Sequence, residues 1–348
     1  MTFRLPKAIA IPLIVHAILF VLVVVGILPR SIVPWWTVAL VAWALWADPK
    51  VSTIFFATAI PLFIAIPVTA NFDNFNMWRL VSVAIAARWL FTNGHLHLTW
   101  QAIRSWPSRF KKMPVATGLV VLVVLAVLSV GVAPDHAAAL KRIIYFANAA
   151  LVPLVVFALA RDDRQWRHTL VSGIAWSAVI VIIAGIVQLI STYLIDVYTF
   201  MVVWGEGIQL RQFGSQWSSI AVHQGNTWLA YYGDQLSLRV FSLFPDSHSF
   251  PVYVLLALSD IAAIALEPVW NAGGTLWTRL GTRARVSVLW LVTGLLLAVL
   301  SGTRGIWAAA ILIVPLMLAT LWVMPMNRTS FFFSLSTNAS AIAIPGKR

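Results

Sequence analysis

Long apolar runs, separated by short polar stretches, make up most of this chain. A helix needs about 20 predominantly apolar residues to cross the hydrocarbon core of a bilayer, and runs of this kind recur almost to the C-terminal end. The pattern predicts ten membrane-spanning helices, of which the second, fourth and ninth are short, at residues 8–28, 32–47, 52–70, 76–93, 114–133, 143–160, 169–194, 249–267, 286–301 and 305–325.

The composition supports this interpretation. Hydrophobic residues make up 61% of the chain and charged residues 10%, whereas soluble domains are nearer half apolar and a quarter charged. We therefore expect an all-α, polytopic membrane bundle over residues 1–325, followed by a short polar tail at 326–348. The chain contains no cysteine, which excludes disulfides, haem attachment and thiolate metal sites.

The net charge of +13 raises the question of nucleic acid as a partner, but the distribution of the basic residues argues against it. They lie in short loops between apolar runs, together with 18 Trp, a pattern typical of orienting charges and interfacial belts in membrane proteins. Cytoplasmic loops carry the excess of Lys and Arg, so the basic segments at 1–7, 93–113, 161–167 and 273–285 predict a cytoplasmic N-terminus. Lys141 and Arg142 are the exception.

The long segment 195–248 is external in this topology. A structureless connection of this length is unusual, so we expect it to fold over the bundle as short interfacial helices or as a lid. It ends in "RVFSLFPDSHSFPVY", where Arg239, Asp246 and His248 precede the eighth span. A second charged break, "LSGTRGIW", places Arg304 at the external start of the tenth span.

Arg239 and Arg304 are therefore predicted to lie at the same membrane face, and the hairpin of the eighth and ninth spans connects them. Arginine forms bidentate hydrogen bonds with phosphate and stays charged, so two arginines near the headgroup level suit a diphosphate. The alternative is that each arginine only reaches from the end of its span to the interface, which is its usual role there.

The two segments resemble the paired arginine signatures of the O-antigen ligases and the related O-antigen polymerases. "RVFSLFPDSHSFPVYVLLAL" is similar to the arginine segment before a late span of that family, and "LSGTRGIW" is similar to its Thr/Ser-Arg-Gly step. The resemblance covers residues 110–325. It implies a glycosyltransferase of the bacterial inner membrane that needs no metal and transfers a glycan from a polyprenyl-linked donor to a glycan or lipid acceptor. By this match, Arg239 and Arg304 bind the lipid diphosphate.

The sequence leaves the catalytic residue open. Members of that family usually carry a further external loop with a histidine, and no histidine follows His248 here. We expect a truncated or split product, an inactive member, or substitution by His248 or His223. Asp246, Asp260 and Arg211 are possible supporting residues, although Asp260, which lies within its span, equally suits a structural charge pair.

Two other classes of function stay open, namely a transporter or flippase of a lipid-linked or anionic solute, and an inactive membrane scaffold. A transporter is expected to place charged residues along the interior of several spans, whereas here they gather at one face, which favours the enzyme. His95 and His97 lie in a basic loop without a nearby carboxylate, so we expect no metal site there.

Overall fold

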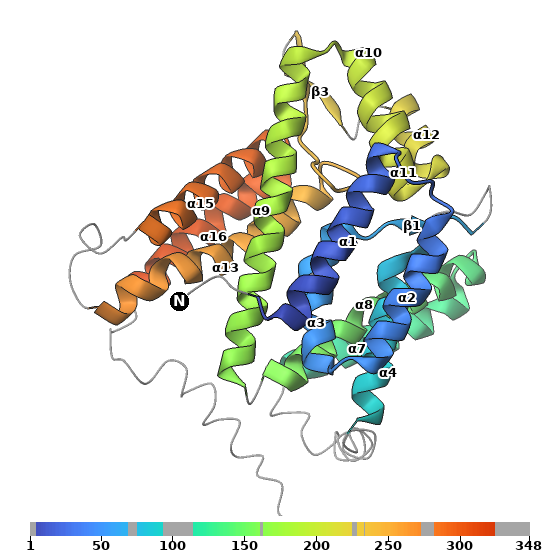
Figure 1. The fold of residues 1–348 in the computed structure, drawn as a ribbon, viewed down its shortest axis with the longest axis vertical. Coiled ribbons are helices and arrows are strands. Elements are labelled where there is room, and N and C mark those ends of the chain that lie inside the picture. Colours follow the sequence, from blue (N-terminus) through green and yellow to red (C-terminus); the bar gives the residue numbers. More distant parts are fainter. Residues whose placement is uncertain are drawn as a thin grey trace, which may run out of the picture. The chain divides into compact units, whose positions relative to one another are not determined.

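The computed structural model describes residues 5–68, 75–92, 114–160, 163–224, 228–232, 234–272 and 282–323, and over these residues the protein is mostly helical (Figure 1). Every predicted span overlaps a helix, so the predicted helical fold class is confirmed. The expectations for the loop with His95 and His97 and for the tail at 326–348 fall outside the described residues.

Three helices of the described chain are both long and apolar enough to cross a membrane, namely α1 (Lys7–Val25), α8 (His136–Ala160) and α9 (Arg164–Leu194). Shorter apolar helices accompany them. Large apolar side chains such as Ile18, Leu154 and Ile190 are exposed on these helices. Extensive exposed apolar surface is rare in soluble monomers, so these features indicate a membrane protein. The count of ten crossings stays a prediction.

The chain divides into two compact units, which we describe separately. Their assembly into one bundle stays a prediction. The first unit contains Met1–Ala160 and Met201–Val222. Its elements are α1, α2 (Ile32–Trp46), α3 (Pro49–Ala59), η1 (Ile60–Leu62), β1 (Ala65–Ile66), β2 (Phe75–Asn76), α4 (Met77–Phe91), α7 (Pro114–Ser129), η3 (Val130–Val132), α8, the π-helix η4 (Met201–Gln209), α11 (Leu210–Phe213) and most of α12 (Ser215–Gln224).

The third predicted span, 52–70, does not form one helix. The helix α3 ends at Ala59, and Pro61 lies in the short 3₁₀ turn η1 that follows. Proline has no N–H to continue the helical ladder, and its ring clashes with the preceding turn, so the chain leaves the helix here. The strand β1 then pairs antiparallel with β2, and α4 follows.

The second unit contains Arg161–Phe200 and His223–Arg348. Its elements are α9, α10 (Val197–Phe200), the antiparallel hairpin of β3 (Leu229–Tyr232) and β4 (Gln235–Leu238), α13 (Ser249–Ala272), α15 (Thr282–Leu300) and α16 (Arg304–Val323). The segment 195–248 thus contains the short helices that the sequence predicts, and it also contains a β-hairpin that the sequence did not predict.

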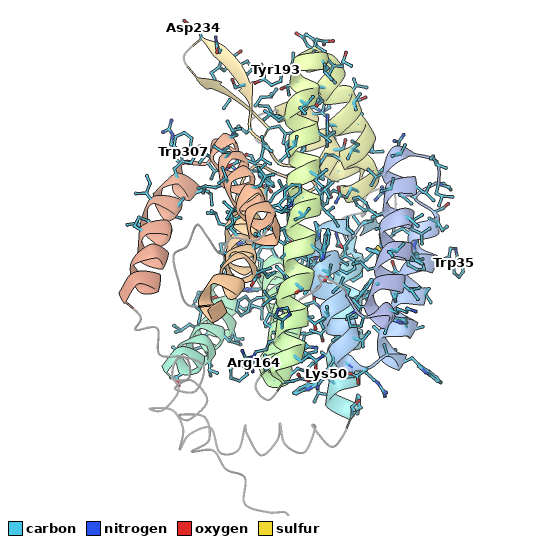
Figure 2. The ribbon with its side chains drawn as sticks, turned by 60° about the vertical axis from the view of Figure 1, so that its left-hand side comes forward. Trp35, Lys50, Arg164, Tyr193, Asp234 and Trp307 are labelled. Carbon is cyan, nitrogen blue, oxygen red and sulfur yellow. The ribbon has the colours of Figure 1, made fainter. Side chains whose placement is uncertain are left out.

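The helix α9 is the longest element of the second unit, with 31 residues. At a rise of 1.5 Å per residue it extends about 46 Å, which exceeds the roughly 30 Å of a hydrocarbon core. In Figure 2, Arg164 lies at one end of α9 and Tyr193 at the other, and the hairpin tip at Asp234 lies toward the Tyr193 end.

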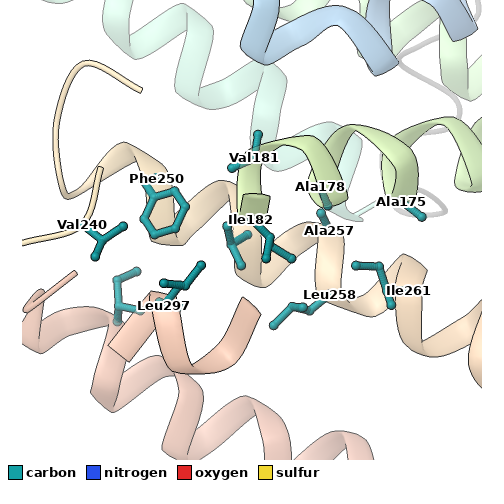
Figure 3. Close-up of a cluster of buried hydrophobic side chains, with 13 residues drawn as sticks. Ala175, Ala178, Val181, Ile182, Val240, Phe250, Ala257, Leu258, Ile261 and Leu297 are labelled. Carbon is teal, nitrogen blue, oxygen red and sulfur yellow. The ribbon is translucent and has the colours of Figure 1, made fainter. Parts of the chain in front are cut away.

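A buried apolar cluster joins α9, α13 and α15 (Figure 3). Its members are Ala175, Ala178, Val181, Ile182, Val240, Phe250, Val254, Ala257, Leu258, Ile261, Leu297, Ala298 and Ile306. A Cβ on Gly294 of α15 would lie 2.9 Å from Leu258 Cδ2 and 3.0 Å from Ile182 Cδ1. Small residues let membrane helices approach closely, so Gly294 allows α15 to pack tightly against α13 and α9.

Aspartates directly precede or cap the N-termini of several helices of the described chain. Each of the following accepts a hydrogen bond from a backbone N–H two or three residues further on: Asp48, Asp135, Asp163, Asp196 and Asp246. The first N–H groups of a helix have no partner within it, and a carboxylate supplies one. The hydroxyl of Thr199 also donates to Asp196 at 2.6 Å, and this bond, with the backbone N–H groups of Thr199 and Tyr198, lowers the pKa of Asp196.

Replacing Gly294 by valine should destabilise the second unit, because the added side chain has no room beside Leu258 and Ile182. Overpacking a tightly packed interior typically costs about 1–3 kcal/mol, so Gly294→Val should lower the thermal unfolding temperature of the purified protein in detergent. Gly118→Val in α7 is the matched control, since nothing lies within 4 Å of a Cβ built on Gly118. Equal unfolding temperatures for the two variants would contradict this packing.

Candidate functional site

A buried glutamine fastens the turn between β4 and α13 to the helix α9. Gln188 is fully buried, and its Oε1 accepts hydrogen bonds from the backbone N–H groups of Phe241 and Ser242, each at 2.9 Å. The Ser242 hydroxyl donates to the carbonyl of Val181 at 2.6 Å. Ser242 has a φ of 52°, a left-handed conformation that costs roughly 1–2 kcal/mol outside glycine. The three hydrogen bonds to α9 stabilise the turn in this conformation.

The backbone of the same turn also joins the end of α15. The N–H of Arg239 donates to the carbonyl of Trp228 at 2.7 Å, and the N–H of Val240 donates to the carbonyl of Leu300 at 3.3 Å. Trp228 is buried and stacks on Phe241, with the ring centroids 4.6 Å apart. The chain at Arg239 is therefore held from both sides.

The side chain of Arg239 reaches the connection between α15 and α16. Its Nε donates to the carbonyl of Ser301 at 3.2 Å, and its Nη2 lies 3.5 Å from the hydroxyl of Thr303. That hydroxyl in turn donates to the carbonyl of Ser247 at 2.8 Å. Arg304 directly follows Thr303 and is exposed. The structure thus brings Arg239 against the segment that carries Arg304. It does so through Thr303, the threonine of the Thr/Ser-Arg-Gly step, and through the carbonyls of Ser301 and Ser247, whose part in this contact the sequence did not predict.

Two helix N-termini meet at this place. The helices α13 and α16 begin at Ser249 and Arg304, and the hydrogen bond from Thr303 to Ser247 joins the segments just before them. The N–H groups of the first turn give each N-terminus a partial positive charge, and anions bind there readily. With two guanidinium groups beside these helix ends, the site is positive, although the carboxylate of Asp246 offsets part of the charge.

Asp246 and His248 flank Ser247, so they lie at this site. The carboxylate of Asp246 accepts hydrogen bonds from the N–H groups of His248 and Ser249, both at 2.8 Å, and from the Ser249 hydroxyl at 3.0 Å. Asp246 therefore caps α13. The His248 side chain is 61% exposed, and its Nδ1 lies 3.9 Å from the Asp246 carboxylate. An accessible imidazole of this kind can accept a proton, so His248 stays a candidate base.

The other predicted site residues lie elsewhere in the chain. Arg211 belongs to the first unit, where its Nη1 donates to the carbonyls of Val24 and Val25 at the C-terminal end of α1, and a cation there complements the helix dipole. His223 is exposed at the end of α12, and Asp260 is half-buried within α13. The roles of these three residues in substrate binding or catalysis stay predictions.

Among the described residues, no group of three His, Asp or Glu side chains is arranged to hold a metal ion. Comparison of the chain with models of protein families, with curated proteins and with solved structures finds no match. The class of this protein therefore rests on its own features, which are apolar helices suited to a membrane and a positively charged site at helix N-termini.

Replacing Gln188 by leucine should release the turn that carries Arg239. The change leaves the N–H groups of Phe241 and Ser242 buried without an acceptor, and each such group costs about 1–3 kcal/mol. Gln188→Leu should therefore lower the unfolding temperature in detergent and speed hydrogen exchange in the peptide containing residues 239–248.

Gln165→Leu is the control for this substitution, because Gln165 is exposed on the same helix. If hydrogen exchange in the 239–248 peptide is as slow in Gln188→Leu as in Gln165→Leu, Gln188 does not anchor the turn.

Proposed function

We propose that this chain is a membrane glycosyltransferase of the O-antigen ligase type, which transfers a glycan from polyprenyl diphosphate to an acceptor hydroxyl. The observation that carries the proposal is the contact of Arg239 with the carbonyl of Ser301 and the hydroxyl of Thr303, directly before Arg304. These two arginines belong to the two segments that resemble the signatures of that family. Two arginines that share one diphosphate need to be close in space, and this contact supports such an arrangement.

A diphosphate is the ligand that suits this site best. It carries several negative charges, and each guanidinium offers a planar set of N–H donors to the phosphate oxygens. The N-termini of α13 and α16 add a favourable electrostatic interaction with an anion. Arg239 is oriented by its hydrogen bond to Ser301, whereas Arg304 is exposed in the first turn of α16. One arginine is thus fixed in place and the other is able to adjust to the ligand.

In the transfer step, the acceptor oxygen forms a bond with the anomeric carbon while the bond between that carbon and the diphosphate oxygen breaks. The electron pair stays on the leaving polyprenyl diphosphate, and Arg239 and Arg304 stabilise its negative charge. The proton of the acceptor hydroxyl passes to a general base. We assign this role to His248, because it is exposed and directly follows Ser247, whose carbonyl accepts the hydrogen bond from Thr303.

The location of the arginines suits a donor that is embedded in the membrane. Arg239 comes just before α13, and Arg304 begins α16, so both lie at the ends of apolar helices, where lipid headgroups lie. With a cytoplasmic N-terminus and ten crossings, these helix ends face the outside of the bacterial inner membrane. A polyprenyl chain in the bilayer would hold its diphosphate at the same height.

Binding of a polyprenyl diphosphate analogue in nanodiscs tests the proposal. A lysine keeps the charge but lacks the planar set of donors, and a hydrogen bond to a charged group is worth about 1.5–3 kcal/mol, so Arg239→Lys and Arg304→Lys should each weaken binding about ten- to a hundredfold. If both arginines contact one diphosphate, the effects in the double variant should not be additive.

Arg164→Lys is the control for these variants, because Arg164 is an exposed arginine at the start of α9. Unchanged affinity in both single variants would mean that Arg239 and Arg304 only anchor their helices. The arginines could bind the analogue while a labelled glycan, still attached to its polyprenyl lipid, crosses the membrane of proteoliposomes. That result would show that the protein is the flippase and not the transferase.

A further inference from the structure

A second cationic site lies in the first unit, where the start of α4 packs against the start of α8. The guanidinium of Arg79 lies over two aromatic rings, with its Cζ 3.6 Å from the centre of the Tyr145 ring and 4.9 Å from that of Trp78. Stacking of this kind holds the guanidinium plane and directs its N–H groups outward from the edge. The transfer reaction proposed above does not use these residues.

Two of the three guanidinium nitrogens of Arg79 have no acceptor among the described residues. Its Nε and Nη1 are buried, and neither has a hydrogen-bond partner in the described chain. The backbone at this position is fixed, because Asn148 donates to the carbonyl of Arg79 at 3.0 Å and Ser82 donates to the Asn148 side chain at 3.4 Å. Buried N–H donors without acceptors are costly, so the site favours the addition of an oxyanion.

A second cation lies near the Tyr145 ring. The Nζ of Lys141 is 5.6 Å from the centre of that ring, and the exposed Arg142 follows Lys141 in the chain. Asp135 directly precedes α8, and its carboxylate accepts a hydrogen bond from the N–H of Ala138 as a helix cap. The positive charges of Arg79 and Lys141 at the starts of α4 and α8 favour the binding of an anion.

We propose that this site binds the phosphate of an anionic phospholipid. Arg79 lies in the first turn of α4, and Lys141 and Arg142 lie in the first two turns of α8, so all three are at the ends of apolar helices, where headgroups lie. Farther along α8, Ile144 and Leu154 are exposed and apolar, and acyl chains pack against them. The phosphate accepts hydrogen bonds from Arg79, and the two other cations disfavour a headgroup that carries its own positive charge.

Thermal unfolding of the full chain in detergent tests this site, because a ligand that binds only the folded state raises the unfolding temperature. Dioctanoyl phosphatidylglycerol, dioctanoyl phosphatidylcholine and inorganic phosphate are added in separate titrations. Phosphatidylglycerol should stabilise the wild type most. In Arg79→Gln its half-saturating concentration should rise about ten- to a hundredfold, and in Lys141→Gln it should rise less.

Arg88→Gln is the matched control, because Arg88 lies in the last turn of the same helix and its Nε donates to the carbonyl of Ala47. It should respond to phosphatidylglycerol as the wild type does. An equal response of Arg79→Gln, or equal stabilisation of the wild type by the two lipids, would overturn the proposal. Equal stabilisation by inorganic phosphate would mean that the ligand is a soluble phosphate. If Arg79→Gln does not fold, Lys141→Gln at its exposed position decides the question.

Discussion

One buried amide oxygen fixes the part of the molecule on which the proposed function depends. The Oε1 of Gln188 accepts hydrogen bonds from two successive backbone N–H groups, at Phe241 and Ser242, so the chain crosses α9 at one defined point. Two residues earlier the side chain of Arg239 leaves this turn and reaches the start of α16. The apolar cluster, the turn and the cationic site therefore form one assembly, since the turn contributes Val240 to the cluster.

The lengths of the apolar runs predicted where the helices lie, because a helix that crosses a bilayer must satisfy its backbone hydrogen bonds within itself. The break after α3 was missed, although Pro61 was visible, because apolar residues continue on both sides of it. The hairpin of β3 and β4 was missed for a different reason. Its strands have only four residues each, and the stacking that supports it joins Trp228 before β3 to Phe241 after β4, outside the strands themselves.

The candidate site was predictable only in part. The sequence placed Arg239 and Arg304 at one membrane face, because a hairpin of two spans returns the chain to the side from which it left. It assigned Asp246 to the site for its charge, whereas this carboxylate caps α13; an Asp just before an apolar run is the signal for such a cap. Gln188 carried no signal, because its partners are backbone N–H groups, which every residue except proline has.

The central claim is that the segment before α13 lies against the start of α16, and a crosslink tests it most directly. Exposed cysteines are introduced by His248→Cys and Arg304→Cys in this cysteine-free chain, a protease site is inserted between α13 and α15, and a short bifunctional thiol reagent is added. Thr303 precedes position 304 and Ser247 precedes position 248, and the hydrogen bond between them brings the two cysteines near each other. We therefore predict that the two fragments stay joined after proteolysis only in the double-cysteine variant. Fragments that separate would contradict the account.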